Sequence, residues 1–189
     1  RLVPGPPQTF PWKRECLQRC GDNRVMNAMK LGPTAIDPNQ QQASGSLLLG
    51  DQMCFALYSA SNGIIRAYRA PLAKLGLTYP QYLAMLVLWE HGDQTIKSLA
   101  KQLDLDSSTI TPLVKRLAAA GLVHRERDPA NERNLRVQLT AAGRALHAPA
   151  ALVQQRVACQ TGLRQEEFLL LRSQLHELAR RLEQAQAET

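Results

Sequence analysis

Cys54 is the residue of this 189-residue chain whose type and setting most directly suggest chemistry. It lies four residues before Tyr58, a spacing that places both side chains on one face of a helix. A phenol hydroxyl stabilises a neighbouring thiolate by donating a hydrogen bond to it. The pair therefore predicts either a stabilised thiolate or a buried, inert cysteine that packs beside a core tyrosine.

The other three cysteines are Cys16, Cys20 and Cys159. Cys16 and Cys20 form an isolated Cys-x3-Cys pair with no second pair and no nearby histidine, so we expect no metal site and no cofactor. Four cysteines are also too few for a scaffold held by disulfides. This usage favours a cytoplasmic, reducing setting, in which a disulfide is a transient redox event rather than a structural link.

A second set of residues predicts contact with nucleic acid. A turn at 104–106 precedes a predicted helix whose polar side chains could contact base edges and phosphates in the DNA major groove. This candidate face comprises Ser107, Ser108, Thr109, Thr111, Lys115 and Arg116. Arg133 follows in a polar hairpin tip, from which an arginine can enter a narrow minor groove. Taken singly, the hydroxyls are also explained as helix caps and the basic residues as a solvated surface.

The elements that would position these residues follow from the hydrophobic pattern. Apolar residues recur at helical spacing over most of 47–187, but they alternate as in strands at 122–127 and 135–140. Pro112 favours a helix start near Ser108 or later, and Pro149 predicts a kink. The predicted helices cover 47–75, 79–91, 95–103, 108–120, 140–160 and 164–187, and the polar segment 128–134 forms the hairpin tip.

This order predicts a mainly α fold with a small β-hairpin wing, that is, a winged helix-turn-helix. Its DNA-binding part is expected at about residues 78–140. The long helices on either side carry apolar stripes that a small winged domain cannot bury, so we expect a homodimer joined through the N- and C-terminal helices. Two recognition helices would then face a palindromic site on double-stranded DNA.

The composition agrees with an acidic partner, and it distinguishes the first 46 residues from the rest of the chain. The formal net charge is +7, and no apolar run is long enough to cross a membrane. Residues 1–46 hold six of the eleven prolines and show no periodicity, so we expect a flexible tail there and the folded domain at 47–187. Met26 and Met29 are candidate starts, which makes residues 1–25 a candidate non-native upstream extension.

Three segments carry a family pattern. They are Met53-Cys54-Phe-Ala-Leu-Tyr58-Ser-Ala60, Leu77-Thr-Tyr79-Pro-Gln-Tyr82-Leu-Ala-Met-Leu-Val-Leu-Trp89-Glu90 and Leu105-Asp-Ser-Ser-Thr109-Ile-Thr-Pro112-Leu-Val-Lys115-Arg116-Leu117. These segments resemble the organic-hydroperoxide-sensing repressors of the MarR family, and the first two are distinctive of that subfamily. The similarity covers roughly residues 49–185.

The resemblance implies a homodimeric repressor, not an enzyme, that leaves its DNA operator when an organic hydroperoxide oxidises Cys54. It implies that Tyr68 and Tyr79 hydrogen-bond to the Cys54 thiolate and that Tyr58 belongs to the same pocket. Tyr68 follows Cys54 by about 21 Å along one straight helix, so their contact would need the other subunit. Cys159 matches the resolving cysteine of the two-cysteine branch, which implies an intersubunit disulfide with Cys54.

One position departs from the family pattern, and three other readings stay open. The family wing reads Asp-x-Arg, whereas Asn131 precedes Glu132 and Arg133 here, so the arginine would be held less rigidly unless Glu132 or Asp128 substitutes. The alternatives are a MarR-type repressor released by a small phenolic or drug-like ligand, a thiol peroxidase, and a protein-interaction module.

Overall fold

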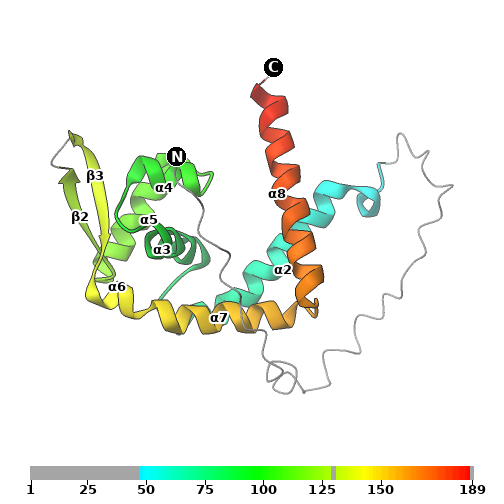
Figure 1. Ribbon diagram of the computed structural model, residues 1–189, viewed down its shortest axis with the longest axis horizontal. Coiled ribbons are helices and arrows are strands. Elements are labelled where there is room, and N and C mark those ends of the chain that lie inside the picture. Colours follow the sequence, from blue (N-terminus) through cyan, green and yellow to red (C-terminus); the bar gives the residue numbers. More distant parts are fainter. Residues whose placement is uncertain (1–46, 129–130, 188–189) are drawn as a thin grey trace. The chain divides into compact units, whose positions relative to one another are not determined.

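The computed structural model describes residues 47–128 and 131–187, apart from the side chains of residues 128 and 131–134. The predicted tail, with Cys16 and Cys20, lies outside the described residues. The described residues fall into two compact units, 47–157 and 158–187. Their order of helices and strands is that of the predicted winged helix-turn-helix (Figure 1). No helix in the described ranges is long and apolar enough to cross a membrane.

The first long helix starts later than its apolar pattern predicted. A single 3-10 turn, η2 (Leu49–Asp51), comes first, and α2 (Met53–Ala73) follows. Gln52 stands between them in an extended conformation, so the prediction of one helix from Leu47 was wrong. Beyond this point α2 is continuous for 21 residues, because Pro71 lies in its last turn and removes only one main-chain hydrogen bond.

The next helix, α3 (Tyr79–His91), has the predicted bounds because the sequence specifies both of its ends. The backbone N–H of Thr78 donates to Oε1 of Gln81 (2.8 Å), which forms a capping box at the start. Gly92 ends the helix at a φ of 70°, a conformation that glycine adopts without steric cost.

The helix-turn-helix pair consists of α4 (Ile96–Gln102) and α5 (Ser107–Ala119). Asp106 is the N-cap of α5, so the predicted start near Ser108 or later was too late. Pro112 consequently lies well inside the helix. The fold tolerates this proline because it is exposed. Proline has no N–H to donate to the main-chain carbonyl of Ser108, four residues earlier, but water can donate to that carbonyl instead.

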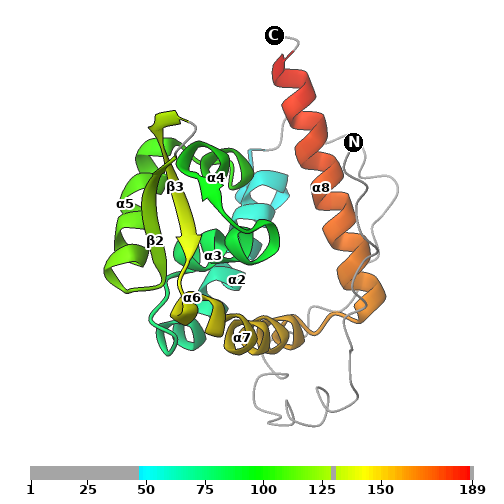
Figure 2. The ribbon, with the colours of Figure 1, turned by 60° about the vertical axis from the view of Figure 1, so that its left-hand side comes forward.

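An antiparallel sheet of three strands completes the winged unit, in the order β1-β3-β2. The strands are β1 (Gln94–Thr95), β2 (Val123–Asp128) and β3 (Asn131–Leu139). Figure 2 shows β2 and β3 running together beside the helix-turn-helix pair. The predicted strands are confirmed, but β1 was missed because two residues are too few to show alternation.

The hairpin is tighter than the predicted tip of 128–134. β3 already begins at Asn131, which pairs with Asp128 after an irregularity in register. Pro129 and Ala130 lie outside the described residues. The predicted alternation in β3 is confirmed at its centre, since Val137 is fully buried.

The single helix predicted at 140–160 is two helices, α6 (Ala141–Ala145) and α7 (His147–Gln160). Thr140 caps the first as predicted, accepting a hydrogen bond from the N–H of Gly143 (3.0 Å). The break precedes Pro149 because a proline ring excludes the helical main-chain bond to the residue four positions earlier. In the second unit, α8 (Gln165–Ala187) follows Gly162, which has a φ of 69°.

One apolar core holds the winged unit together and fixes α3 and α5. Its largest fully buried members are one residue each of α2, α4 and β3, two of α3 and three of α5. They are Leu72, Met85, Leu88, Leu99, Ile110, Val114, Leu117 and Val137. Because α5 buries one face in this core, its other face is left for solvent or a partner.

Gly143 gives a test of how tightly α6 is held against the wing. A Cβ at this position would clash with the backbone carbonyl of Leu122. We expect Gly143→Ala to lower the free energy of unfolding by about 1–3 kcal/mol, as for other overpacked sites. Urea unfolding of the wild type and the variant, at the same protein concentration, measures this difference in the free energy of unfolding. Gly50→Ala is the control, because nothing lies within 4 Å of the added methyl; equal losses in both variants would contradict the contact.

Candidate functional site

Three tyrosines meet where the end of α2 packs against the start of α3. The ring centroid of Tyr68 lies 5.3 Å from that of Tyr79 and 5.4 Å from that of Tyr82. The Tyr79 and Tyr82 centroids are 6.3 Å apart. The structure thus brings together Tyr68 and Tyr79, as the resemblance implied, and adds a third phenol. We call these three residues the tyrosine cluster.

Burial governs the acidity of the tyrosine cluster. Burial raises the pKa of Tyr68 far above the ordinary value for a phenol, and the neighbouring phenols of Tyr82 and Tyr79 raise it further. It also raises the pKa of Tyr79 and that of Tyr82. All three hydroxyls therefore keep their protons at neutral pH, so the cluster can donate hydrogen bonds to an anion but cannot act as a base.

Cys54 lies at the other end of α2, on its second residue. Its thiol is free and exposed. Tyr58, one turn further along, is also exposed, with 66% of its surface accessible. The reading of Cys54 as a core cysteine beside a core tyrosine is therefore wrong for the single subunit. Cys54 and Tyr58 can form a pocket only if residues from another part of an assembly cover them.

The continuity of α2 keeps Cys54 away from the tyrosine cluster within one subunit. Cys54 and Tyr68 belong to the same unbroken helix, and fourteen residues at 1.5 Å per residue separate them by about 21 Å. A hydrogen bond spans about 3 Å. The structure of one chain therefore does not bring together the thiol and the phenols that the resemblance implied.

Cys159 lies near the end of α7, in the compact unit that begins at residue 158. It is disulfide-bonded, and its partner is not Cys54, whose thiol is free. A bond between Cys54 and Cys159 would therefore first require Cys159 as a thiol.

The exposed face of α5 carries the predicted nucleic-acid contacts. Its buried side chains are Ile110, Leu113, Val114 and Leu117. The opposite face presents the predicted residues Ser107, Ser108, Thr109, Lys115 and Arg116 as exposed side chains. Thr111 differs, because its hydroxyl donates to the carbonyl of Ser107 (2.7 Å) within the first turns. Five of the six predicted residues are therefore available to a ligand, while the hydroxyl of the sixth is bonded within the helix.

The wing adds positive charge beside this helix. Arg125 and Arg127 are exposed on β2 and lie opposite Val137 and Leu135 of β3. Arg133 belongs to β3, but its side chain lies outside those described.

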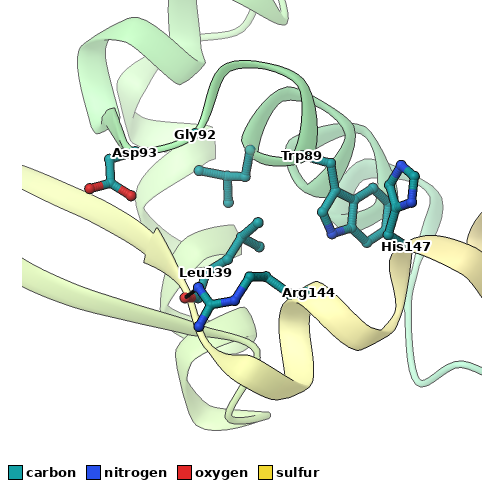
Figure 3. A pocket seen from close by; sticks show the side chains of 7 residues that line it. Trp89, Gly92, Asp93, Leu139, Arg144 and His147 are labelled. Carbon is teal, nitrogen blue, oxygen red and sulfur yellow. Dashed lines mark hydrogen bonds between the residues drawn. The ribbon is translucent and has the colours of Figure 1, made fainter.

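A separate hollow of about 470 Å³ lies where the end of α3 meets β3 and α6 (Figure 3). Nε1 of Trp89 donates to the carbonyl of Gly143 (3.0 Å), and the indole meets the His147 ring edge-on at 5.4 Å. Arg144 donates to the carbonyl of Leu139 (2.7 Å). These contacts join α3 and β3 to α6 and to the start of α7. None of the predicted sensor residues lines the hollow.

Two features of the site were missed by reasoning from the sequence. Tyr82 could have been found, because it follows Tyr79 by three residues and so shares its helical face. Arg125 and Arg127 could also have been found, since their alternation in a predicted strand places both on one face. In the described part of the chain, no group of three or more His, Cys, Asp or Glu side chains could hold a metal ion.

Comparison with known proteins identifies the family. A protein-family model described as the MarR family matches residues 77–135 of the sequence. The HTH-type transcriptional regulator TtmR of Methylorubrum extorquens is 45% identical over 119 residues, or 63% of this chain and 61% of TtmR. The organic hydroperoxide resistance transcriptional regulator of Bacillus subtilis is 39% identical over 136 residues, or 72% of this chain and 92% of that regulator.

Solved structures agree with this match. Reduced AbfR bound to DNA is 35% identical with a TM-score of 0.63, covering 72% of this chain and 94% of AbfR. A disulfide-formed AbfR is 34% identical with a TM-score of 0.53, covering 72% and 91%. AbfR comes from Staphylococcus epidermidis. The match with the B. subtilis regulator and the shared winged-helix fold lead to one conclusion: the chain belongs to the MarR family of transcriptional regulators.

Proposed function

We propose that the chain is a DNA-binding repressor that organic hydroperoxides switch off by oxidising Cys54. The observation that carries this proposal is the arrangement along α2. A free, exposed thiol stands at one end of this helix and a cluster of protonated phenols at the other. A second copy of α2, running the opposite way, would place each thiol beside the phenols of its partner.

Exposed apolar side chains on α2 support the dimer. The helix has only one buried residue, and it leaves large apolar groups open to solvent. They are Met53, Phe55, Leu57, Tyr58, Ile64 and Ile65. In the other unit, α8 has no buried residue and exposes Leu169, Leu170, Leu171, Leu175 and Leu182. Covering such surface stabilises an assembly by roughly 25 cal/mol per Å², so both helices are suited to subunit contact.

In such a dimer, the Cys54 thiolate of one subunit accepts hydrogen bonds from Tyr68 and Tyr79 of the other. These donors lower the pKa of the thiol, because they favour its charged form. Tyr58 and the apolar side chains of Phe55 and Leu57 would line the same pocket. An apolar lining favours an organic hydroperoxide over hydrogen peroxide, since the organic group leaves water on binding.

The oxidation proceeds in two balanced steps. The Cys54 thiolate attacks the terminal oxygen of the hydroperoxide, the O–O bond breaks, and the alkoxide takes a proton to leave as an alcohol. Cys54 is now a sulfenic acid, two electrons more oxidised. The Cys159 thiolate of the other subunit attacks its sulfur, and hydroxide leaves with a proton as water. The product is an intersubunit disulfide.

Release of DNA follows from the change in dimer geometry. The two recognition helices α5 must match two half-sites of a palindromic duplex. A covalent link between subunits shifts the helices that set this spacing. Reduced and disulfide-formed states are both named for AbfR structures, the reduced one on DNA. The cycle requires a reducing compartment, for which a cytoplasmic location is the simplest choice.

A repressor released by a small ligand is the second candidate, and the hollow beside Trp89 favours it. Its volume of about 470 Å³ suits a small aromatic molecule, and Arg144 could pair with an acidic group. Such a repressor would respond to a phenolic compound in the absence of any oxidant. A thiol peroxidase would instead consume many equivalents of peroxide per subunit, whereas a sensor reacts about once per reduction.

The cysteine scheme is tested by covalent dimer formation. Reduced protein is treated with about one equivalent of cumene hydroperoxide and run on a non-reducing gel. We expect a covalent dimer in the wild type and none in Cys54→Ser or Cys159→Ser. The double variant Cys16→Ser/Cys20→Ser is the matched control and should still form the dimer.

Binding to a duplex selected from random DNA is followed in the same samples. Cys54→Ser should keep its DNA affinity after oxidation. A covalent dimer without Cys159, or release of DNA without Cys54, would contradict the scheme. Oxidation of Cys54 with no covalent dimer in any sample would indicate a one-cysteine mechanism instead.

The DNA interface is tested by removing single positive charges. Arg116→Ala and Arg133→Ala should each weaken binding to the selected duplex, and each should reduce the slope of log affinity against log salt by about one if the arginine contacts a phosphate. Covalent dimer formation should not change, because neither residue belongs to the proposed pocket. Arg180→Ala on α8 is the charge-matched control. Unchanged affinity in Arg116→Ala would remove this residue from the interface.

A further inference from the structure

The wing is attached to the rest of the winged unit on both faces of β3. On one face, the side chain of Val137 is fully buried in the core. On the other face, Nε2 of Gln138 donates to Oδ2 of Asp93 (2.9 Å). Because successive side chains of a strand point to opposite faces, the core and this hydrogen bond hold the base of the wing from two sides.

The turn that carries Asp93 is itself fixed to two helices. Asp93 lies between the end of α3 and β1, and the register of β1 with β3 places it opposite Gln138. The side chain of Gln94 holds this turn, since its Nε2 donates to the carbonyl of Asp93 (2.9 Å) and its Oε1 accepts from Oγ of Ser98 in α4 (2.6 Å). The Asp93 carboxylate therefore has a defined position relative to α3 and α4, the two helices that pack against α5.

A small tilt at the base has a large effect at the tip of the wing. Arg133 lies five residues before Gln138 in β3, which corresponds to about 17 Å along an extended strand. A rotation of about 10° at Gln138 would move the tip by about 3 Å, the length of a hydrogen bond. Arg127, exposed on the paired strand β2, would move with it. Contact between the wing and DNA therefore depends on the tilt that is fixed at the base.

We propose that Asp93 and Gln138 are positioning residues for DNA binding: their hydrogen bond sets the tilt of the wing, so that the wing arginines and α5 reach DNA at the same time. This inference rests on the proposed contact between the wing and DNA. Neither residue needs to touch the nucleic acid. A carboxylate repels phosphates by itself, so Asp93 favours binding only through the position that it gives the wing.

The sign of the effect at Asp93 separates positioning from electrostatics. The measured quantity is the affinity of the reduced, full-length protein for the selected duplex. We expect Asp93→Ala and Gln138→Ala each to weaken binding about three- to tenfold, as for the loss of one net hydrogen bond. Asp93→Asn keeps an acceptor for Gln138 and loses the repelling charge, so it should bind at least as tightly as the wild type. Glu90→Ala, which removes an exposed carboxylate from α3, is the charge-matched control and should not weaken binding.

A second measurement shows whether the effect passes through the wing. The double variant Arg127→Ala/Arg133→Ala removes two positive charges from the wing, and Arg116→Ala removes one from α5. The wing variant should lose less affinity in a Gln138→Ala background than in the wild-type background, because a misplaced wing has already lost part of its contacts. Arg116→Ala should lose the same affinity in both backgrounds. Urea unfolding of Gln138→Ala and the wild type checks that the winged unit stays folded.

The contradicting outcomes are distinct. Wild-type affinity in Gln138→Ala, or equal weakening in Asp93→Asn and Asp93→Ala, refutes the positioning role. Equal losses from the wing variant in both backgrounds also refute it, since the hydrogen bond would then act elsewhere than on the wing. No loss from the wing variant in the wild-type background refutes the proposed wing contact and this inference together, whereas a loss in Arg116→Ala would still support DNA binding by α5.

Discussion

The length of α2 is the constraint on which the rest of the account depends. A continuous helix from Met53 to Ala73 holds the thiol of Cys54 and the phenol of Tyr68 on fixed positions along one rod. No rotation of side chains closes about 21 Å. In the proposed repressor, the thiol must therefore take those phenols from another copy of the chain, so that sensing would depend on the contact between subunits.

The same helix joins the proposed sensor to the DNA-binding part. Its last turns contribute Leu72 to the core that also holds α3 and α5. Its first turns contribute almost nothing to that core and expose apolar side chains instead. The last turns of α2 thus stabilise the winged unit, while its first turns are left exposed for the proposed contact between subunits, to which Tyr68 near the other end also contributes. In the proposed dimer, a covalent change at the subunit contact would therefore move whole winged units without unfolding them.

The sequence predicts most of the fold where local signals are strong. Thr78 and Gly92 specify both ends of α3, and the alternation in β3 identifies its buried Val137. It is less exact at the start of α5, which lies one residue earlier than predicted, and at Pro149, where the predicted kink is a full break between α6 and α7. The site divides in the same way. The pairing of Tyr68 with Tyr79 depends on how α2 packs against α3, so the family resemblance was needed to predict it, while the burial of Tyr82 follows only from the assembled core.

The most direct test of the account is the rate of Cys54 oxidation in a purified heterodimer with differently tagged subunits. One subunit carries Cys54→Ser with intact tyrosines, and the other carries Tyr68→Phe/Tyr79→Phe with an intact Cys54. If the pocket combines the thiol of one subunit with the phenols of the other, one complete pocket remains. Its thiol should then react with cumene hydroperoxide at the wild-type rate. Reaction as slow as in the Tyr68→Phe/Tyr79→Phe homodimer would contradict a pocket shared between subunits.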